Sequence, residues 1–370
     1  MTRLNELYEK YGQSPWIDNI RRDWLNDGTL ATFVAQGVRG LTSNPSIFAK
    51  ALATSSAYDG AVEASTDRNP EDLFETLAVA DVRDACDVLA GVHEQSRADF
   101  ASGRRRYLDG FVSIEVSPRL ARDTEGTISA AKRLAARVDR PNVLIKIPAT
   151  LEGLPAIRAV LAEGINVNVT LIFSLARYDD VITAWTQGLD DAVRAGHDLA
   201  SLASVASFFV SRVDVAVDAL LPAGDPRRGT TANAQAAAAY RLYRQRVIGG
   251  DVISLLAKGA QVQRPLWAST STKNPAYDDL LYVDSLVADE TVNTMPDATL
   301  ADLLDHANFT KSLLLNDDSR DRAAGLLAKL APDVSLDKVT AQLEDEGVAA
   351  FSKSYEEALA TVASKMSARS

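Results

Sequence analysis

The stretch NVLIKIP, residues 142–148, joins an apolar strand pattern to a single ionisable side chain. Side chains alternate between the two faces of a β-strand, so Val143, Ile145 and Ile147 share one face. That face is wholly apolar and suits packing against a helix. Lys146 lies on the opposite face. The stretch therefore predicts a strand with one helix-covered face and one face that carries an amine.

Two further stretches repeat this pattern. In FVSIEV, residues 111–116, Ser113 and Glu115 oppose an apolar face. In NVNVTLIF, residues 166–173, the apolar face holds Val167, Val169, Leu171 and Phe173, and the polar face holds Asn166, Asn168 and Thr170. In a (β/α)₈ TIM barrel one face of each strand looks inwards, and catalytic groups gather at the carboxyl ends of the strands. An open doubly wound sheet would not explain polar groups that converge from three strands, so the pattern favours a barrel.

Along the whole chain, short β-rich apolar runs alternate with longer helical patterns, which is typical of βα units. Eight strands are expected, near residues 15–19, 38–44, 111–116, 142–148, 166–173, 203–210, 264–270 and 280–287. We also expect a helical insertion at about 46–108 and a helical tail at about 297–370. Barrels often exceed the average domain length, so the prediction is one α/β domain over residues 1–370: a barrel with additional helices.

Composition indicates a soluble globular protein, because 46% of the residues are hydrophobic and 24% are charged. No uninterrupted apolar run approaches the ~20 residues that cross a membrane. The N-terminal stretch lacks the apolar core of a signal peptide. Cys86 is the only cysteine, so the chain cannot form an intrachain disulfide. We therefore expect a cytoplasmic protein.

The charge and the histidines exclude several function classes. A net charge of −11 argues against a general role in binding nucleic acid or an anionic membrane. The three histidines, His93, His197 and His306, lie far apart and match no common metal-binding spacing. A solvated or capping role suits all three better than metal ligation or catalysis. We expect no metal site and no cofactor.

Lys146 is the strongest candidate for chemistry. Its neighbours in sequence are apolar, and scarce water disfavours the ammonium form, so we expect a lowered pKa. A neutral amine of this kind is the nucleophile that forms an imine with a ketone. The alternative is a lysine that reaches solvent from the strand end, or one that simply pairs with a carboxylate.

Six motifs then occur in a characteristic order: WID (16–18), LTSNPS (41–46), SIEV (113–116), LIKIPAT (144–150), NVNVTLIFS (166–174) and WASTSTKNP (267–275). In this order they resemble the motifs of transaldolases, and most closely the longer bacterial subfamily that also occurs fused to glucose-6-phosphate isomerase. The resemblance covers nearly the whole chain, including NTMP (293–296) and GVAAF (347–351). It implies a barrel of the class I aldolase type and no cofactor.

The resemblance also implies a reaction. A dihydroxyacetone unit passes from sedoheptulose 7-phosphate to glyceraldehyde 3-phosphate, a step of the non-oxidative pentose phosphate pathway. Lys146 resembles the lysine that carries this unit as a Schiff base. Asp18 resembles the carboxylate that takes the proton of the C4 hydroxyl as the C3–C4 bond breaks. Glu115 and Thr170 resemble the pair that holds a catalytic water.

Substrate-binding roles follow in the same way. Asn44, Asn168 and Ser207 resemble the groups that hydrogen-bond the dihydroxyacetone hydroxyls. Arg212 resembles the arginine that clamps the substrate phosphate, and Ser269 and Lys273 are the expected additional contacts. One departure from the family pattern is visible: Ser271 stands where this subfamily is expected to have glycine.

Several alternatives stay open at this point. Asp18 could cap the helix that follows, Asn44 could make a turn before a proline, and Ser207 could be a small packed residue. Lys273 could form an exposed ion pair. A fructose-6-phosphate aldolase would use the same lysine but release free dihydroxyacetone, and a non-catalytic sugar-phosphate sensor would need no lysine. The expected partners are sugar phosphates, and the sequence does not decide between a monomer and a homodimer.

Overall fold

A parallel sheet forms the centre of the computed structural model, which describes residues 1–250 and 252–367. Within these residues the sheet has seven strands in the order β1-β7-β6-β5-β4-β3-β2, and all neighbours are parallel. The strands are β1 (Ser14–Ile17), β2 (Val112–Glu115), β3 (Val143–Pro148), β4 (Val167–Ile172), β5 (Ser204–Phe209), β6 (Arg264–Ala268) and β7 (Val292–Met295). The α/β class expected from the sequence is confirmed.

The two ends of this strand order meet at Leu41. Leu41 forms parallel bridges to Ile17 of β1 and to Val112 of β2. The backbone N–H of Ile17 donates to the carbonyl of Gly40 at 3.0 Å, and the N–H of Ser113 donates to the carbonyl of Leu41 at 3.0 Å. The strand expected at 38–44 is thus reduced to a one-residue bridge, and the sheet curls back on itself there.

The strand expected at 280–287 is wrong. This segment contains a short helix, α14 (Leu281–Asp284), and the last strand is β7, further along the chain. Leu280, Val283 and Leu286 are fully buried and recur every three residues, which is the spacing of one buried helical face. Apolar and polar residues do not alternate in this short segment, so its sequence alone does not distinguish a strand from a helix.

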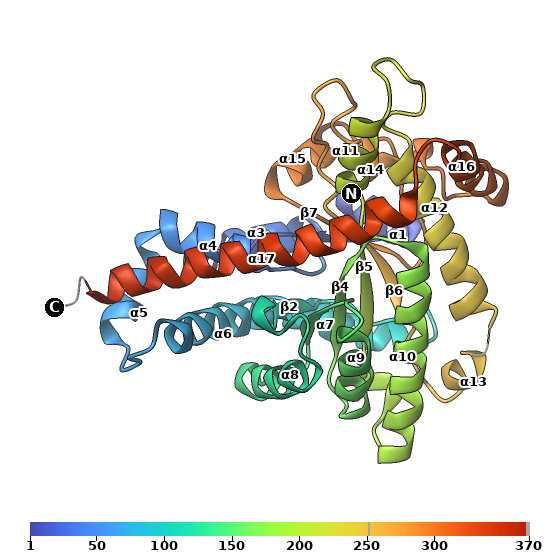
Figure 1. Cartoon of the computed structure of the whole chain (residues 1–370). Helices are drawn as coiled ribbons and strands as arrows, with labels where there is room; N and C mark the ends of the chain where they lie inside the picture. The colour runs from blue at the N-terminus through green and yellow to red at the C-terminus, as the bar shows by residue number, and fades with distance from the viewer. Residues whose placement is uncertain (251, 368–370) are drawn as a thin grey trace.

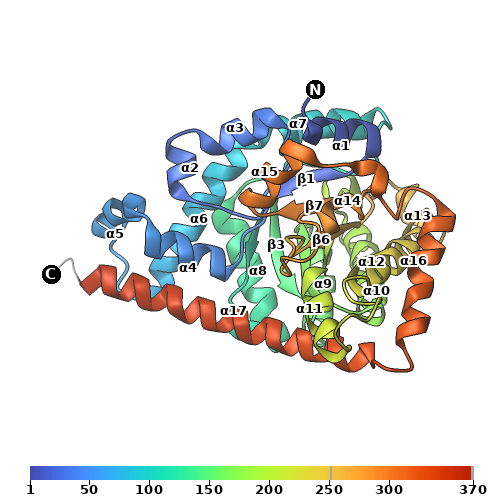
Figure 2. The same cartoon turned by 90° about the horizontal axis from the view of Figure 1, so that it is seen from above.

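Helices surround the sheet and fill the connections between strands (Figures 1 and 2). Before β2 lie α1 (Arg3–Tyr11), α2 (Arg22–Asn26), α3 (Thr29–Gln36), α4 (Pro45–Thr54), α5 (Asp59–Ala64), α6 (Pro70–Val88) and α7 (Ala90–Ala101). Between β2 and β7 lie, besides α14, α8 (Thr124–Val138), α9 (Gly153–Ala162), α10 (Leu175–Ala195), α11 (Ser211–Leu220), α12 (Thr231–Tyr243) and α13 (Ile253–Leu256). The helices α15 (Asp297–His306), α16 (Asp317–Leu330) and α17 (Leu336–Ser367) follow β7. No helix in the described ranges is long and apolar enough to span a bilayer.

The last helix, α17, is the longest and crosses the molecule as a single rod (Figures 1 and 2). It packs against α4, α6 and β4 of the N-terminal half and against α11 of the C-terminal half. Its close approach to β4 depends on Gly347, because a β carbon there would lie 3.0 Å from Cδ2 of Leu171. One turn further along α17, the side chain of Phe351 is buried, and the centroid of its ring lies 5.9 Å from Nζ of Lys146.

A buried ion cluster fixes the amino-terminal ends of β1 and β6. Asp109 is fully buried and accepts hydrogen bonds from Oγ of Ser14 at 2.5 Å and from Nε1 of Trp16 at 2.9 Å. It also pairs with Arg39 at 3.0 Å and with Arg264 at 3.4 Å. Burial alone would raise the pKa of Asp109, but the two guanidinium groups hold it below its ordinary value. The opposite ends of these strands lead into the candidate site.

Candidate active site

Lys146 of β3 and Glu115 of β2 form a buried pair at the centre of the site. The two residues are register partners in neighbouring parallel strands, so their side chains leave the sheet on the same face. Each side chain is only 5% exposed, and Nζ of Lys146 lies 3.5 Å from Oε2 of Glu115. Nζ also donates a hydrogen bond to the carbonyl of Ser43 at 3.1 Å. The alternative of a solvent-exposed Lys146 is therefore wrong, whereas pairing with a carboxylate is observed.

Glu115 has the titration behaviour of an acid–base group. Its burial raises the pKa of the carboxyl to about 7, although the Lys146 ammonium opposes this shift. Oε2 of Glu115 is buried and has no hydrogen-bond partner among the described residues. A carboxyl that titrates near neutral pH can both accept and return a proton during one reaction cycle.

Thr170 of β4 is a second buried polar group without a partner. Its Oγ1 makes no hydrogen bond to any residue that the structure describes. β4 is irregular here: its register to β5 shifts between Val169 and Ile172, and Leu171 has a φ of +58°. Bulges of this kind often lie beside active sites, where they redirect side chains. Leu171, expected to pack outwards with Val169, lies instead against Gly347 of α17.

Asn168 of β4 is held in one orientation by two serines, Ser113 of β2 and Ser207 of β5. Its Nδ2 donates to Oγ of Ser113 at 3.0 Å, and its Oδ1 accepts from Oγ of Ser207 at 2.7 Å. Asn168 is also the register partner of Lys146. Ser207 is thus a hydrogen-bonding member of the site and not only a small packed residue. Donors and acceptors on three strands are arranged in this way next to the amine.

Asp18 lies just beyond the end of β1, and its carboxylate is oriented by a threonine. Oγ1 of Thr42 donates to Oδ1 of Asp18 at 2.7 Å, and it lies 2.6 Å from Oγ1 of Thr294 on β7. The next helix, α2, has no side-chain cap among the described residues, so the capping role considered for Asp18 is wrong. Asn44 does cap a helix, because its Oδ1 accepts from the N–H of Ile47 in α4 at 3.0 Å.

Two cations, Arg212 and Lys273, lie at the other side of the site. Neither forms an ion pair with a carboxylate within the described part of the chain, so the ion pair considered for Lys273 is wrong. Burial lowers the pKa of Arg212, and partial burial together with Arg212 lowers the pKa of Lys273. Two cations that repel each other and form no direct ion pair within the described residues are suited to an anionic ligand.

The loop after β6 completes this cationic side. Ser269 adopts a φ of +57°, a conformation that non-glycine residues reach at a cost of about 1–3 kcal/mol. Its Oγ lies 3.0 Å from Oγ of Ser211. Ser271, in the position where glycine was expected, does not have a positive φ, and its Oγ accepts a hydrogen bond from Lys273 at 2.5 Å. Serine therefore fits this backbone without strain and orients the lysine.

These groups surround one cavity of about 120 Å³, which we call the substrate cavity. It is lined by Asp18, Thr42, Asn44, Lys146, Ser207, Phe209, Arg212, Ala268, Ser269, Ser271, Lys273, Thr294, Pro296 and Phe351. Seven of the ten expected site residues line it: Asp18, Asn44, Lys146, Ser207, Arg212, Ser269 and Lys273. Glu115, Asn168 and Thr170 lie in the strands behind this lining.

Sequence reasoning missed four contributors. Thr42 and Ser43 lie inside the motif that contains Asn44, but nothing marked them as groups that orient Asp18 and Lys146. Thr294 lies in the unrecognised strand β7. Phe351 lies in the GVAAF stretch, yet only the docking of α17 brings it to Lys146. Within the described residues no cluster of three or more His, Cys, Asp or Glu side chains could hold a metal ion.

Comparison with known proteins gives one consistent result. A family model described as Transaldolase/Fructose-6-phosphate aldolase matches residues 15–362. A transaldolase of Thermobifida fusca is 48% identical over 365 residues, which cover 96% of this chain and 96% of that protein. A transaldolase of Saccharopolyspora erythraea is 46% identical over 371 residues, with 96% of each chain covered. One of Neisseria gonorrhoeae is 43% identical over 363 residues, covering 97% of this chain and 99% of that protein.

Proposed function

The chain belongs to the transaldolase/fructose-6-phosphate aldolase family, and on that premise we propose that it is a transaldolase working through a Schiff base on Lys146. The enzyme transfers a dihydroxyacetone unit from sedoheptulose 7-phosphate to glyceraldehyde 3-phosphate, giving erythrose 4-phosphate and fructose 6-phosphate. One observation carries the proposal. The Lys146 amine is almost wholly buried beside a carboxylate, yet it lines a cavity that is also lined by two cations, neither of which forms an ion pair in the described part of the chain. A phosphorylated ketose needs this combination to form an imine.

The same proposal extends to the architecture. Residues 1–370 form one domain, a (β/α)₈ barrel in which the segment around Leu41 takes the place of the eighth strand. The parallel bridges of Leu41 to β1 and to β2 support this assignment. Inward-facing groups at the carboxyl ends of the strands then form the site, as is general for this fold. We assign the protein to the cytoplasm, where its substrates are sugar phosphates and its state is a monomer or a homodimer.

The first chemical step joins the donor ketone to Lys146. The neutral amine attacks the keto carbon, and the carbinolamine that results loses one water to give a protonated imine. The proton must leave the ammonium and return to the departing hydroxyl, and Glu115 lies 3.5 Å from Nζ with a pKa of about 7. Glu115 and Thr170 each present a buried oxygen that makes no hydrogen bond within the described residues, and buried oxygens of this kind are normally satisfied by water. We therefore assign to these two residues the binding of the water that is released when the imine forms.

The second step breaks the C3–C4 bond of the bound sugar. Asp18 takes the proton from the C4 hydroxyl, and the electrons of the broken bond move into the protonated imine. The hydrogen bond from Thr42 fixes the orientation of the Asp18 carboxylate for this transfer. Two carboxylates are needed because imine formation and bond cleavage move different protons.

The remaining groups hold the substrate. Asn44, Asn168 and Ser207 hydrogen-bond the hydroxyls of the three-carbon unit. Arg212 binds the phosphate as a fork, and Lys273 and Ser269 add contacts on the same side. Together they retain the three-carbon unit as an enamine until the acceptor aldehyde arrives.

A transfer assay tests the proposal. The purified protein is mixed with fructose 6-phosphate and erythrose 4-phosphate, and glyceraldehyde 3-phosphate and sedoheptulose 7-phosphate are measured. We expect both products in equal amounts. Release of free dihydroxyacetone at a comparable rate would instead make the protein an aldolase, and no turnover would favour a sugar-phosphate sensor.

A further inference from the structure

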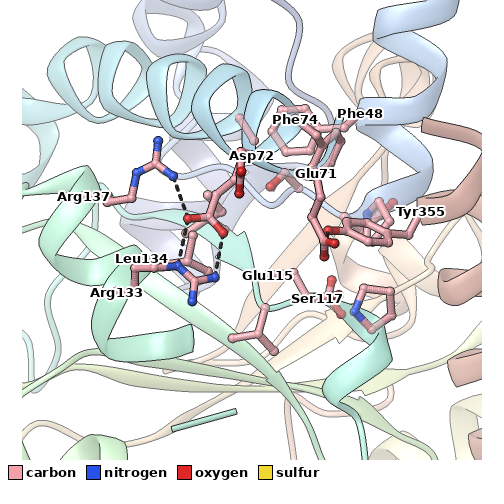
Figure 3. A pocket seen from close by; sticks show the side chains of 18 residues that line it. Phe48, Glu71, Asp72, Phe74, Glu115, Ser117, Arg133, Leu134, Arg137 and Tyr355 are labelled. Carbon is pink, nitrogen blue, oxygen red and sulfur yellow. Dashed lines mark hydrogen bonds and ion pairs between the residues drawn. The ribbon is translucent and has the colours of Figure 1, made fainter. Parts of the chain in front are cut away.

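A second and larger cavity lies on the far side of Glu115 (Figure 3). Its volume is about 360 Å³, and we call it the lateral cavity. It lies between α4, α6, α8, α17 and the end of β2. Space of this size has room for several water molecules.

Three charged groups that line the lateral cavity, Glu75, Arg133 and Arg137, are paired with one another. Glu75 accepts hydrogen bonds from Arg133 at 2.7 Å and 3.0 Å and from Arg137 at 2.7 Å. Figure 3 shows the guanidinium groups of Arg133 and Arg137 lying close together, with dashed lines marking their interactions. Glu71 accepts from the Tyr355 hydroxyl at 2.9 Å. The cavity therefore offers no uncompensated charge on these groups to bind an ionic ligand. The lining also includes apolar side chains, among them the buried Ala78 of α6.

The inner end of the lateral cavity reaches the catalytic pair. Glu115 lines the lateral cavity, Lys146 lines the substrate cavity, and 3.5 Å separates their charged atoms. Asn44 lines both cavities. Glu115 and Asn44 thus lie where the two spaces approach each other, and Oε2 of Glu115 has no hydrogen-bond partner in the described part of the chain. Buried polar oxygens of this kind are normally satisfied by water.

The chemistry of the Schiff base requires water to move at this point. Each imine that forms from a ketone and an amine releases one water, and each imine that is hydrolysed consumes one. During both events the sugar phosphate fills the substrate cavity of about 120 Å³, and Phe351 lies over the amine. The bound substrate then blocks the movement of water through the substrate cavity.

We propose that the lateral cavity is the path by which water reaches and leaves the Lys146–Glu115 pair while substrate is bound. The inference rests on the proposed function, because it presupposes an imine on Lys146. Glu115 has two tasks in this arrangement, since it moves protons for Lys146 and stands at the mouth of the water path. Water then reaches the imine from the side of Glu115, and the substrate cavity that holds the enamine stays dry.

Oxygen exchange tests this inference. Fructose 6-phosphate is incubated with the protein in H₂¹⁸O without an acceptor, and label at C2 is followed by mass spectrometry, corrected for spontaneous exchange. Label enters only when the released water is replaced before the imine is hydrolysed. The rate of imine formation is measured in parallel by rapid quenching with borohydride. The ratio of the two rates reports water passage independently of the chemistry.

Ala78→Phe fills the lateral cavity from α6, and Ala80→Phe is the matched control, because Ala80 lies on the exposed side of the same helix. We expect exchange per imine formed to fall about tenfold in Ala78→Phe, as an added barrier of ~1.4 kcal/mol produces, and to stay unchanged in Ala80→Phe. If Ala78→Phe does not fold, Ala78→Leu is used and a smaller fall is expected.

The two possible failures are distinguishable. The water path would be overturned if a folded Ala78 variant that still forms the imine showed the same ratio of oxygen exchange to imine formation as the wild-type protein. That result would leave the proposed function intact. Absence of any borohydride adduct on Lys146 in the wild-type protein would overturn the proposed function itself.

Discussion

Replacing Glu115 by glutamine should stabilise the protein at alkaline pH while it removes activity. Glutamine keeps the shape of the side chain but cannot ionise. The folded state raises the pKa of this carboxyl from 4.5 to about 7, mainly through burial. Because the folded-state pKa lies above the unfolded value, the ionised wild-type residue penalises the folded state increasingly as the pH rises from 4.5 through 7.

The size of the effect follows from the two pKa values. Each pH unit between them is worth about 1.4 kcal/mol, so the penalty reaches about 3 kcal/mol once the carboxyl is ionised in both states. The side chain is only 5% exposed, so solvent screening reduces this figure little. At pH 5 the difference between Glu115→Gln and wild type should be under about 1 kcal/mol, and at pH 8 it should approach the full value.

Chemical denaturation of both proteins at pH 5 and pH 8 measures this difference. Glu94→Gln is the control, because Glu94 is an exposed residue of α7. Imine formation, followed by borohydride quenching, should slow by about 10²–10⁴ in Glu115→Gln, since general acid–base catalysis contributes that much. The raised pKa of Glu115 would be wrong if wild type and Glu115→Gln differed equally in unfolding free energy at pH 5 and pH 8. It would also be wrong if wild type were more stable than Glu115→Gln at pH 8.

Three further predictions concern the phosphate side, the buried ions and α17. Arg212→Lys should raise KM for fructose 6-phosphate by about 10–100-fold, because the lysine cannot offer a two-pronged donor, and should leave turnover of unphosphorylated fructose unchanged; equal losses for both sugars would contradict the assignment. Asp109→Asn should cost about 3–5 kcal/mol in denaturation experiments, because two guanidinium groups lose their buried counter-ion; an unchanged unfolding free energy would show that the cluster is not structural. Gly347→Val should lower Tm and kcat by pressing α17 off Leu171, whose Cδ2 would lie 3.0 Å from the new β carbon, and a fully active variant would separate α17 from the site.

The local pattern of side chains predicted part of the fold well. The alternation in β2, β3 and β4 placed Glu115, Lys146 and Asn168 on one face, and the structure brings them together as register partners. This succeeds because strand periodicity is a property of a few consecutive residues. The same reasoning failed at 280–287, where apolar and polar residues do not alternate. β7 escaped detection because it has four residues and two of them, Asn293 and Thr294, are polar.

The rest of the site depends on contacts between distant segments. Phe351 reaches Lys146 only because α17 packs on β4, and no feature of the GVAAF stretch itself indicates that contact. The bulge at Leu171 arises where β4 changes register against β5, which a single strand sequence does not encode. The lateral cavity lies between α4, α6, α8, α17 and the end of β2, so its existence follows from their tertiary packing alone.

The most direct test of the central claim is trapping of the imine. The protein is incubated with fructose 6-phosphate without an acceptor, reduced with borohydride, digested and mapped by mass spectrometry, with Lys146→Met as the control. We expect a reduced dihydroxyacetone adduct on Lys146, none in the control, and loss of the trappable unit once erythrose 4-phosphate is added. An adduct on another lysine, or no adduct at all, would contradict the central claim.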